Sequence, residues 1–328
     1  MSIMEIREMK RAMMENYGPH AMEMLGSIQG KAKLFLDYCK KNVDKIVGII
    51  QPHVNQEIIW SYCEYAFKAV IDSGERVQNV VVMKSNVKLT LVWLIFVIGS
   101  FIRDFLIWPD TYFSNSKNIF NILFVKKGLG WTLLFVGGLI NTNLVSKGEV
   151  NRIVFIADNL KLIVYTILWY CCTGFFESVE NFTGTCVGDS SISGKLACRK
   201  SGRLWDGFDI SGHCFLLSFC ILIINKELNE YFDDNEDEDL DEEDDIELVV
   251  KDTDYRMKFI SKAAKCFSVC SVYLMILFEV MIFFTSVYFH TLAQKLFGML
   301  FGIGAWYICY KYIFTMGFDV ILSQTFSS

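Results

Sequence analysis

Two of the four histidines in this chain lie at corresponding edges of two apolar segments. His213 follows Asp209-Ile210-Ser211-Gly212 at the start of one segment, and His290 closes the other. One segment enters a membrane and the other leaves it two crossings later, so both imidazoles are expected at one membrane face. Such a pair can transfer a phosphoryl group, one imidazole acting as nucleophile and the other as acid. The alternative is a pair of interfacial histidines whose polar ends reach lipid headgroups.

The apolar residues, 53% of the chain, come in long runs rather than in the stripe of a soluble helix. A helical span needs about 20 mostly apolar residues. No alternation of period two suggests a barrel, so an all-α integral membrane fold is expected. The six predicted spans cover residues 89–108, 130–145, 153–176, 208–224, 266–289 and 296–314.

Polar residues interrupt some of these spans. Asn141, Asn143, Asp158 and Lys161 weaken the second and third. Glu279 lies near the middle of the fifth, where a charge costs roughly 2.5–3.5 kcal/mol on insertion scales. Glu279 is therefore expected to be protonated, paired or facing a cavity.

The first 88 residues read as a separate cytosolic helical extension. An amphipathic helix is expected over residues 31–50, before Pro52, and a second helix over residues 56–70. No apolar stretch of a cleavable signal occurs among the first 25 residues, so the first span is expected to act as an uncleaved anchor. Residues 89–315 would form the six-span domain, and residues 316–328 a cytosolic tail.

The net charge of −6 comes from one segment, since residues 227–247 hold fourteen acidic and no basic residues. The rest of the chain has 31 basic residues against 37 − 14 = 23 acidic ones. A segment so charged is expected to be an unburied, disordered loop, placed within a cytosolic insertion at 227–257. A solvated spacer is the simple interpretation, and a Ca²⁺ or basic-partner tether is the alternative, without EF-hand spacing.

The loop after the third span indicates which face is luminal. Asn181 begins the chain's N-x-Ser/Thr sequon, and Cys186 and Cys198 lie in the same polar loop. A sequon and a cysteine pair suit an oxidising lumen, which predicts a disulfide, a glycosylation site at Asn181 and cytosolic termini. The distribution of Lys and Arg between the two faces also favours cytosolic termini, but only by a small excess. His213 and His290 would then face the lumen.

Four motifs resemble the fat storage-inducing transmembrane protein family. The two histidine blocks are WDGFDISGHCFLL at 205–217 and VYFHTLAQKLFG at 287–298. The shorter segments YFSNSKN at 112–118 and ENFTG at 180–184 agree, in the same order along residues 90–315. The resemblance implies a six-span endoplasmic-reticulum protein that supports lipid-droplet formation and is related to lipid phosphate phosphatases.

The resemblance also implies hydrolysis of the diphosphate bond of fatty acyl-coenzyme A, giving acyl 4′-phosphopantetheine and adenosine 3′,5′-bisphosphate. In the pattern of the related phosphatases, His290 would be the nucleophile and His213 the general acid. Ser211 and the Gly212 amide would bind a non-bridging oxygen. Diacylglycerol and triacylglycerol are expected membrane partners, with no nucleic acid, no cofactor and no metal ligand set.

The chain departs from the phosphatase pattern at two points. Gln294 stands where that pattern has an Asp four residues after the second histidine, and the chain contains no Arg-Pro pair. Other residues must therefore orient the imidazole and neutralise the phosphates. For each candidate the alternative is a solvated loop charge without such a role. The candidates for orientation are Asp206, Asp209 and Glu180, and those for phosphate binding are Lys117, Arg199, Lys200, Arg203 and Lys295, of which Lys295 is nearest to His290 in sequence.

Two other functions remain open at the level of sequence. A non-catalytic protein that partitions diacylglycerol and triacylglycerol into droplets fits the apolar composition equally well. A transporter is a third possibility, although spans broken by Gly or Pro are not evident in corresponding halves. Only an enzyme explains two histidines at one face.

Overall fold

The computed structural model describes residues 56–315, apart from 107, 147–151, 190–191, 193 and 242–250. The predicted helix at 31–50 lies outside the described residues. The chain divides into two units, residues 1–69 and 70–328, and the first is described only from Gln56 onward. The predicted helix at 56–70 is confirmed, and it continues to Val81.

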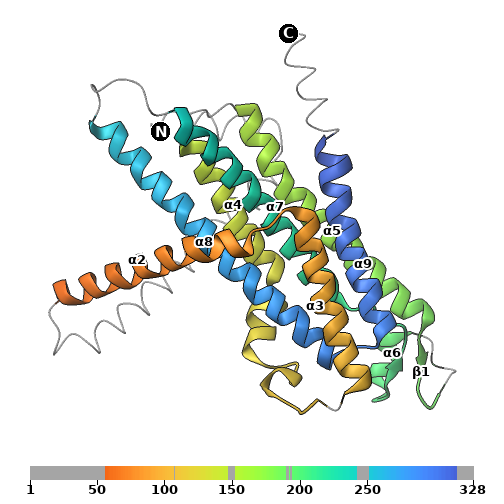
Figure 1. Ribbon diagram of the computed structural model, residues 1–328. Helices are drawn as coiled ribbons and strands as arrows, with labels where there is room; N and C mark the ends of the chain where they lie inside the picture. The colour runs from red at the N-terminus through yellow and green to blue at the C-terminus, as the bar shows by residue number, and fades with distance from the viewer. Residues whose placement is uncertain are drawn as a thin grey trace, which may run out of the picture. The chain divides into compact units, whose positions relative to one another are not determined.

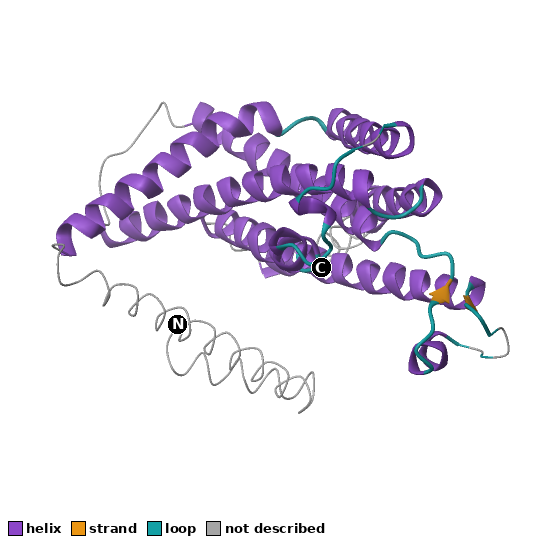
Figure 2. Cartoon of the chain, turned by 90° about the horizontal axis from the view of Figure 1, so that it is seen from below, coloured by secondary structure: helices purple, strands orange, loops and turns teal. Residues whose placement is uncertain are grey.

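Helices make up almost all of the described chain, as Figures 1 and 2 show. Two short antiparallel strands form the exception and lie beside one short helix at one end of the helical bundle (Figure 2). In chain order the elements are α2 (Gln56–Val81), α3 (Ser85–Phe105), η1 (Tyr112–Ser114), η2 (Asn121–Val125), α4 (Gly128–Ser146), α5 (Arg152–Thr183), β1 (Thr185–Cys186), α6 (Lys195–Lys200), β2 (Trp205–Asp206), α7 (Gly212–Asp241), α8 (Lys251–Tyr288), α9 (Leu292–Ile308) and η3 (Cys309–Ile313).

Five helices of the described chain are long and apolar enough to cross a membrane. They match five predicted runs, and the protein is an all-α, multi-pass membrane protein. The predicted run at 208–224 corresponds to α7, which is not among the five because Asn225, Lys226 and Glu227 cut its apolar stretch short. The number of six spans stays a prediction. The five helical stretches are Ser85–Phe105, Gly128–Ser146, Val154–Thr183, Ile260–Tyr288 and Leu292–Ile313.

Helix α7 forms the core of the bundle. It contacts α3, α4, α5, α8 and α9, and its side chains from Cys214 to Ile224 are almost all completely buried. Its packing against α9 depends on small residues. A Cβ at Gly302 would lie 2.1 Å from Ser218 Oγ, and one at Gly298 would lie 2.3 Å from the Ser211 carbonyl oxygen. The two glycines therefore allow the α7 and α9 backbones to approach closely.

The acidic segment is not the loop predicted from its composition. Helix α7 continues through it to Asp241, so the prediction of a disordered loop over residues 227–247 is wrong for residues 227–241. Helix α8 begins at Lys251. The prediction that the segment stays unburied is wrong for Glu227, which is only 4% exposed. The helical frame of α7 carries Glu227 into the bundle, where charged and hydroxyl partners compensate its burial.

Those partners come from α5 and η3. Glu227 Oε1 accepts hydrogen bonds from the hydroxyls of Tyr165, at 2.9 Å, and Tyr310, at 2.6 Å. Lys161 Nζ lies 3.5 Å from Glu227 Oε2 and 3.2 Å from Glu230 Oε2, and Asp158 is 3.4 Å away. The window of α5 that would cross the membrane is only 11% buried, so this network is one of the contacts that fix α5 to the core, together with the hydrogen bonds between Asn141 and Asn159.

Glu279 in α8 is paired rather than exposed to a cavity. Lys88 Nζ of α3 lies 2.6 Å from Glu279 Oε1, and Lys88 is completely buried. Of the three possibilities that the sequence left open, pairing is the one observed. The pair neutralises two charges that would each be costly in the apolar interior.

We predict that Lys161→Met destabilises the protein strongly. Removing the cation leaves Glu227 buried beside two hydroxyls with no counter-charge, a change that costs about 3–5 kcal/mol for a buried pair. Thermal unfolding of purified protein in detergent would show this as a clear drop in the apparent melting temperature.

Lys226→Met is the matched control. Lys226 Nζ lies 3.1 Å from the other Glu230 oxygen, but both side chains are more than a third exposed, so the loss should be about 0–0.5 kcal/mol. Equal melting temperatures for the two variants would show that the buried network does not stabilise the fold.

Candidate active site

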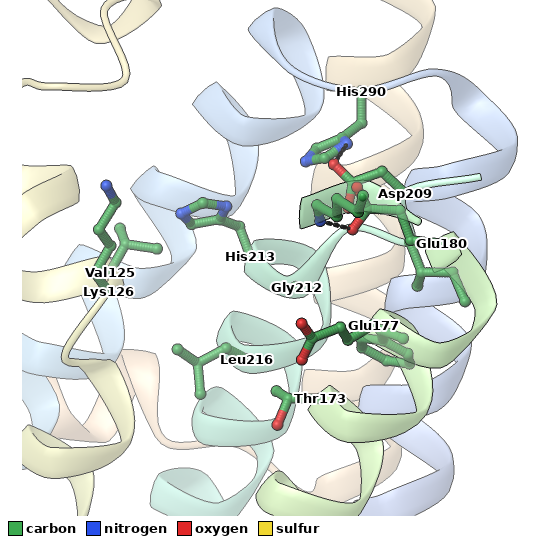
Figure 3. Close-up of a pocket in the computed structure, with 13 residues that line it drawn as sticks. Val125, Lys126, Thr173, Glu177, Glu180, Asp209, Gly212, His213, Leu216 and His290 are labelled. Carbon is green, nitrogen blue, oxygen red and sulfur yellow. Dashed lines mark hydrogen bonds and ion pairs between the residues drawn. The ribbon is translucent and has the colours of Figure 1, made fainter. Parts of the chain in front are cut away.

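His213 and His290 line the same cavity, which has a volume of about 430 Å³. Figure 3 shows the two imidazoles on neighbouring walls, with Asp209 beside His290 and Lys126 on the side of His213. The cavity lies where α5, η2 and the beginning of α7 meet. Its walls consist of Val125, Lys126, Thr173, Phe176, Glu177, Glu180, Lys195, Asp209, Ile210, Gly212, His213, Leu216 and His290.

The first turn of α7 positions His213. The Ser211 hydroxyl accepts a hydrogen bond from the Cys214 amide at 3.3 Å, which caps the helix. The Ser211 amide donates to the Gln294 carbonyl at 3.1 Å and so ties the start of α7 to the start of α9. His213 is therefore held on a capped helix end whose position relative to α9 is fixed.

His290 occupies a strained backbone position between α8 and α9. Its φ of 59° makes it the one residue other than glycine with positive φ in the described part of the chain. A left-handed conformation costs a bulky residue of the order of 1–3 kcal/mol and is kept only where the surroundings impose it. At this position the chain leaves α8 and turns at once into α9, which presents the imidazole to the cavity.

Both flanks of His290 are fixed by hydrogen bonds. On one side Arg103 Nη1 donates to the Tyr288 carbonyl at 2.7 Å, and the Tyr288 hydroxyl donates to the Pro109 carbonyl at 2.9 Å. On the other side Thr291 and Gln294 form a capping box at the start of α9. Gln294, which stands where the phosphatase pattern has Asp, therefore stabilises the turn that carries His290.

Burial, against the effect of the nearest carboxylate, favours a neutral imidazole at His290. Burial lowers the pKa of His290 below its ordinary value, while Asp209 and a hydrogen bond with Gln294 raise it and the cation of Arg103 lowers it further. Asp209 Oδ2 lies 3.8 Å from His290 Nδ1. A neutral imidazole with a carboxylate at Nδ1 leaves Nε2 as the nucleophilic nitrogen.

Lys126 is a cavity residue that the sequence did not single out. It follows η2, and its ammonium acts electrostatically on His213, as does His290. A position next to Lys127, just before the glycine that opens α4, was the available signal, but many loop lysines have a similar position. Its place opposite His213 makes it the cation best placed to bind a phosphate beside both histidines.

The remaining wall is a small structure closed by a disulfide. Cys186 and Cys198, the pair named from the sequence, are bonded, with their Cα atoms 5.6 Å apart. Lys195 of α6 forms an ion pair with Glu180 of α5. Trp205 Nε1 donates to the Glu180 carbonyl at 3.2 Å, so both the side chain and the backbone of Glu180 are held.

The structure brings together only some of the predicted substrate-binding residues. Gly212 and Asp209 line the cavity, together with the two histidines. Ser211 is completely buried and caps α7, and Lys295 is completely buried with its Nζ on the Ser286 carbonyl at 2.6 Å. Arg203 pairs with Asp189 at 2.9 Å, and Lys117 is exposed on another loop; neither lines the cavity.

The other residues named from the sequence occupy surface positions. Asp206 is exposed on β2 and does not line the cavity, so Asp209 is the carboxylate next to His290. Asn181 is exposed in the last turn of α5, and its glycosylation stays a prediction. Nearby, the Thr183 hydroxyl accepts a hydrogen bond from the Phe208 amide at 2.8 Å, which ties α5 to the loop that carries Asp209.

Comparison with known proteins decides the family. The sequence profile of the fat storage-inducing transmembrane proteins matches residues 109–310, which include every residue lining the cavity. The chain belongs to this family.

Its relatives include proteins named acyl-coenzyme A diphosphatase FITM2. The Xenopus laevis protein is 34% identical over 222 residues, 65% of this chain and 77% of that protein. The human protein is 31% identical over 229 residues, 67% and 80% of the two chains. The Drosophila melanogaster protein is 29% identical over 237 residues, 65% and 54%. No solved structure matches the chain.

We predict that Arg103→Ala lowers kcat for acyl-coenzyme A hydrolysis by up to about 100-fold. The reason is that the Tyr288 carbonyl, two residues before His290, then loses its hydrogen-bond donor. The acid limb of the pH profile should also move to higher pH, since the Arg103 cation lowers the pKa of His290. Steady-state rates of oleoyl-coenzyme A hydrolysis, measured over a range of pH, give both kcat and the position of the acid limb.

Arg103→Lys should restore the pH profile more than the rate, because lysine keeps the charge and lacks the guanidinium geometry. Arg76→Ala, which removes an exposed guanidinium from α2, is the control. An unchanged kcat and pH profile in folded Arg103→Ala protein would exclude a role for Arg103 in positioning His290.

Proposed function

We propose that this protein hydrolyses the diphosphate bond of fatty acyl-coenzyme A. The observation that carries the proposal is the meeting of His213 and His290 in one cavity, with Asp209 at the Nδ1 side of His290. The names of the relatives, which are acyl-coenzyme A diphosphatases, support the same reaction. The products would be acyl 4′-phosphopantetheine and adenosine 3′,5′-bisphosphate.

In the first step His290 Nε2 attacks one phosphorus of the diphosphate. A bond forms between nitrogen and phosphorus, and the bond from that phosphorus to the bridging oxygen breaks. The departing phosphate takes the proton of His213, which acts as the general acid. Asp209 stabilises the positive charge that develops on the His290 ring and keeps Nε2 directed toward the phosphorus.

In the second step water hydrolyses the phosphohistidine. The neutral His213 now removes a proton from the water, the new oxygen–phosphorus bond forms, and the bond to His290 breaks. His290 recovers its lone pair at Nε2 and His213 recovers its proton. The cycle consumes one water, leaves one phosphate of the original diphosphate on each product and requires no other reactant.

The phosphate oxygens need positive charge and amide donors, since the Arg-Pro motif of the phosphatases is absent. Lys126 supplies a cation on the His213 side of the cavity, and Gly212 opens α7 with an amide that has no partner within the helix. A helix N-terminus is favourable for anions through its dipole. Lys126 therefore takes the role that the sequence had suggested for Lys295, and the Gly212 amide keeps its suggested role without the Ser211 hydroxyl.

The surroundings of the cavity fit a substrate that is anchored in a bilayer. Val125, Phe176, Ile210 and Leu216 form an apolar wall beside the polar groups. An acyl chain would remain among the spans while the diphosphate reaches the histidines. Diacylglycerol, triacylglycerol and other membrane lipids are the surrounding partners, and the droplet-forming role of the family follows from control of acyl-coenzyme A at this membrane.

The disulfide and the sequon support a luminal active site in the endoplasmic reticulum, with cytosolic termini. Disulfides persist in oxidising compartments, and the disulfide of this chain lies beside the cavity. Asn181, at the same end of α5 as Glu180, would be glycosylated from the lumen. Residues 1–88 and 316–328 would then form the cytosolic N-terminal region and tail of a membrane domain at 89–315.

We predict that His213→Ala and His290→Ala each lower turnover of oleoyl-coenzyme A by at least about 10²–10⁴-fold. The loss should be greater for His290→Ala, because no covalent intermediate can form without the nucleophile. The measurement is release of adenosine 3′,5′-bisphosphate by purified protein.

His53→Ala, which alters a histidine ahead of the first apolar run, should keep wild-type turnover. Wild-type rates in both folded cavity variants would exclude the catalytic assignment. Absence of hydrolysis in the wild type would favour the non-catalytic lipid-partitioning function instead.

We predict that the acid limb of the kcat/KM profile lies below pH 6.5, the ordinary pKa of histidine. Burial lowers the pKa of His290, so the neutral nucleophile persists to lower pH. Asp209→Asn removes an anion that raises this pKa, so the limb should move further down, together with a lower maximum rate. By linkage the fold loses stability as pH falls below 6.5, because the unfolded chain binds this proton more readily.

Asp206→Asn makes the same chemical change on an exposed residue outside the cavity and should leave the profile where it is. An acid limb with its midpoint above pH 6.5 would contradict the assignment of His290 as the neutral nucleophile. An acid limb whose midpoint does not move in Asp209→Asn would contradict it as well.

A further inference from the structure

The proposed substrate carries a third phosphate that the two histidines do not process. Coenzyme A has a phosphate monoester on the ribose 3′-oxygen, one sugar away from the diphosphate. With the diphosphate between His213, His290 and Lys126, the nucleotide must leave the cavity past one of its walls. A wall that offers exposed positive charge there would recognise the 3′-phosphate.

Helix α6 is such a wall. Lys195 lines the cavity, where it forms an ion pair with Glu180. Arg199 lies four residues later, about 40° around the helix, and therefore on the same face. Arg199 is exposed, and in the described part of the chain no ion pair involves it. A guanidinium one helical turn beyond Lys195 adds an exposed positive charge next to the cavity wall.

The wall is rigid enough to select a ligand. Cys198, between the two basic residues in sequence, is completely buried and bonded to Cys186. Strand β1 pairs with β2, and Trp205 on β2 donates to the Glu180 carbonyl. The face of α6 is thus connected by covalent and hydrogen bonds to the same α5 turn that lines the cavity, so the separation between Arg199 and the histidines is fixed.

We propose, resting on the function given above, that Arg199 binds the 3′-phosphate of coenzyme A, so that α6 is the element that recognises the nucleotide half of the substrate. A guanidinium can donate two parallel hydrogen bonds to a phosphate, which suits a terminal monoester. Lys195, held by Glu180, is the inner limit of this subsite. The apolar wall then selects the acyl half and α6 the nucleotide half.

The test compares oleoyl-coenzyme A with oleoyl-3′-dephospho-coenzyme A, which share the acyl chain and the reacting diphosphate. For the full-length wild type in phosphatidylcholine nanodiscs, KM should be about 10-fold or more higher for the dephospho substrate, at similar kcat. Arg199→Ala should raise KM for oleoyl-coenzyme A to the value for the dephospho substrate and leave the latter unchanged.

Lys200→Ala is the matched control, since Lys200 is equally charged and exposed but lies about 140° around the helix from Lys195. It should retain the wild-type preference. Replacing Cys186 and Cys198 together by serine should reduce the preference, because the face of α6 is then no longer fixed.

Each contrary outcome has a distinct meaning. Equal KM values for both substrates in the wild type, or an unchanged preference in Arg199→Ala, would overturn the subsite and leave the diphosphatase function standing. Hydrolysis of neither substrate would overturn the function, and the subsite with it. A loss in Arg199→Ala that is equal for both substrates and occurs only when phosphatidic acid is added to the nanodiscs would assign the face to a lipid phosphate instead.

Discussion

One backbone hydrogen bond joins the two parts of the chain that carry the histidines. The Ser211 amide donates to the Gln294 carbonyl, and the Ser211 carbonyl packs over Gly298, where any Cβ would collide with it. His213 lies two residues beyond Ser211, and His290 four residues before Gln294. This contact therefore sets the spacing between the imidazoles, and it exists only because glycine allows α7 and α9 to come so close.

The same helix performs different tasks at its two ends. At the beginning of α7 a capped turn carries His213 into the cavity. At the other end of its buried stretch, Glu227 binds Lys161, Tyr165 and Tyr310. Because α5 supplies both Lys161 and the cavity wall from Thr173 to Glu180, the buried network also fixes the wall of the active site. A cavity near one end thus depends on charges placed near the other.

The strain at His290 has a comparable explanation. A left-handed histidine is unfavourable by itself, and Arg103, Tyr288 and the capping box of α9 compensate it. These neighbours hold the backbone, and Arg103 and Gln294 also act on the ring, since the Arg103 cation lowers the pKa of His290 and the hydrogen bond with Gln294 raises it. Asp209, a carboxylate from the loop before α7, lies beside Nδ1 of the same ring. Arg103 and Gln294 thus connect the backbone of the turn with the electrostatics of the imidazole.

The sequence alone determined the features that depend on local composition and recurring motifs. Long apolar runs predict membrane helices because lipid cannot satisfy an open backbone, and five of the six runs correspond to such helices, although α5 and α8 extend beyond the predicted bounds. Histidine blocks and a cysteine pair with a sequon pointed to the chemistry, the family and the disulfide. Only the tertiary structure decided which charges surround the histidines. In the sequence Lys126, Lys295 and Glu227 are all charged residues next to apolar runs, yet one lines the cavity, one is buried against Ser286 and one lies inside the bundle. The reason is physical, since the environment of a charge depends on how helices distant in sequence pack together, and no local pattern contains that information.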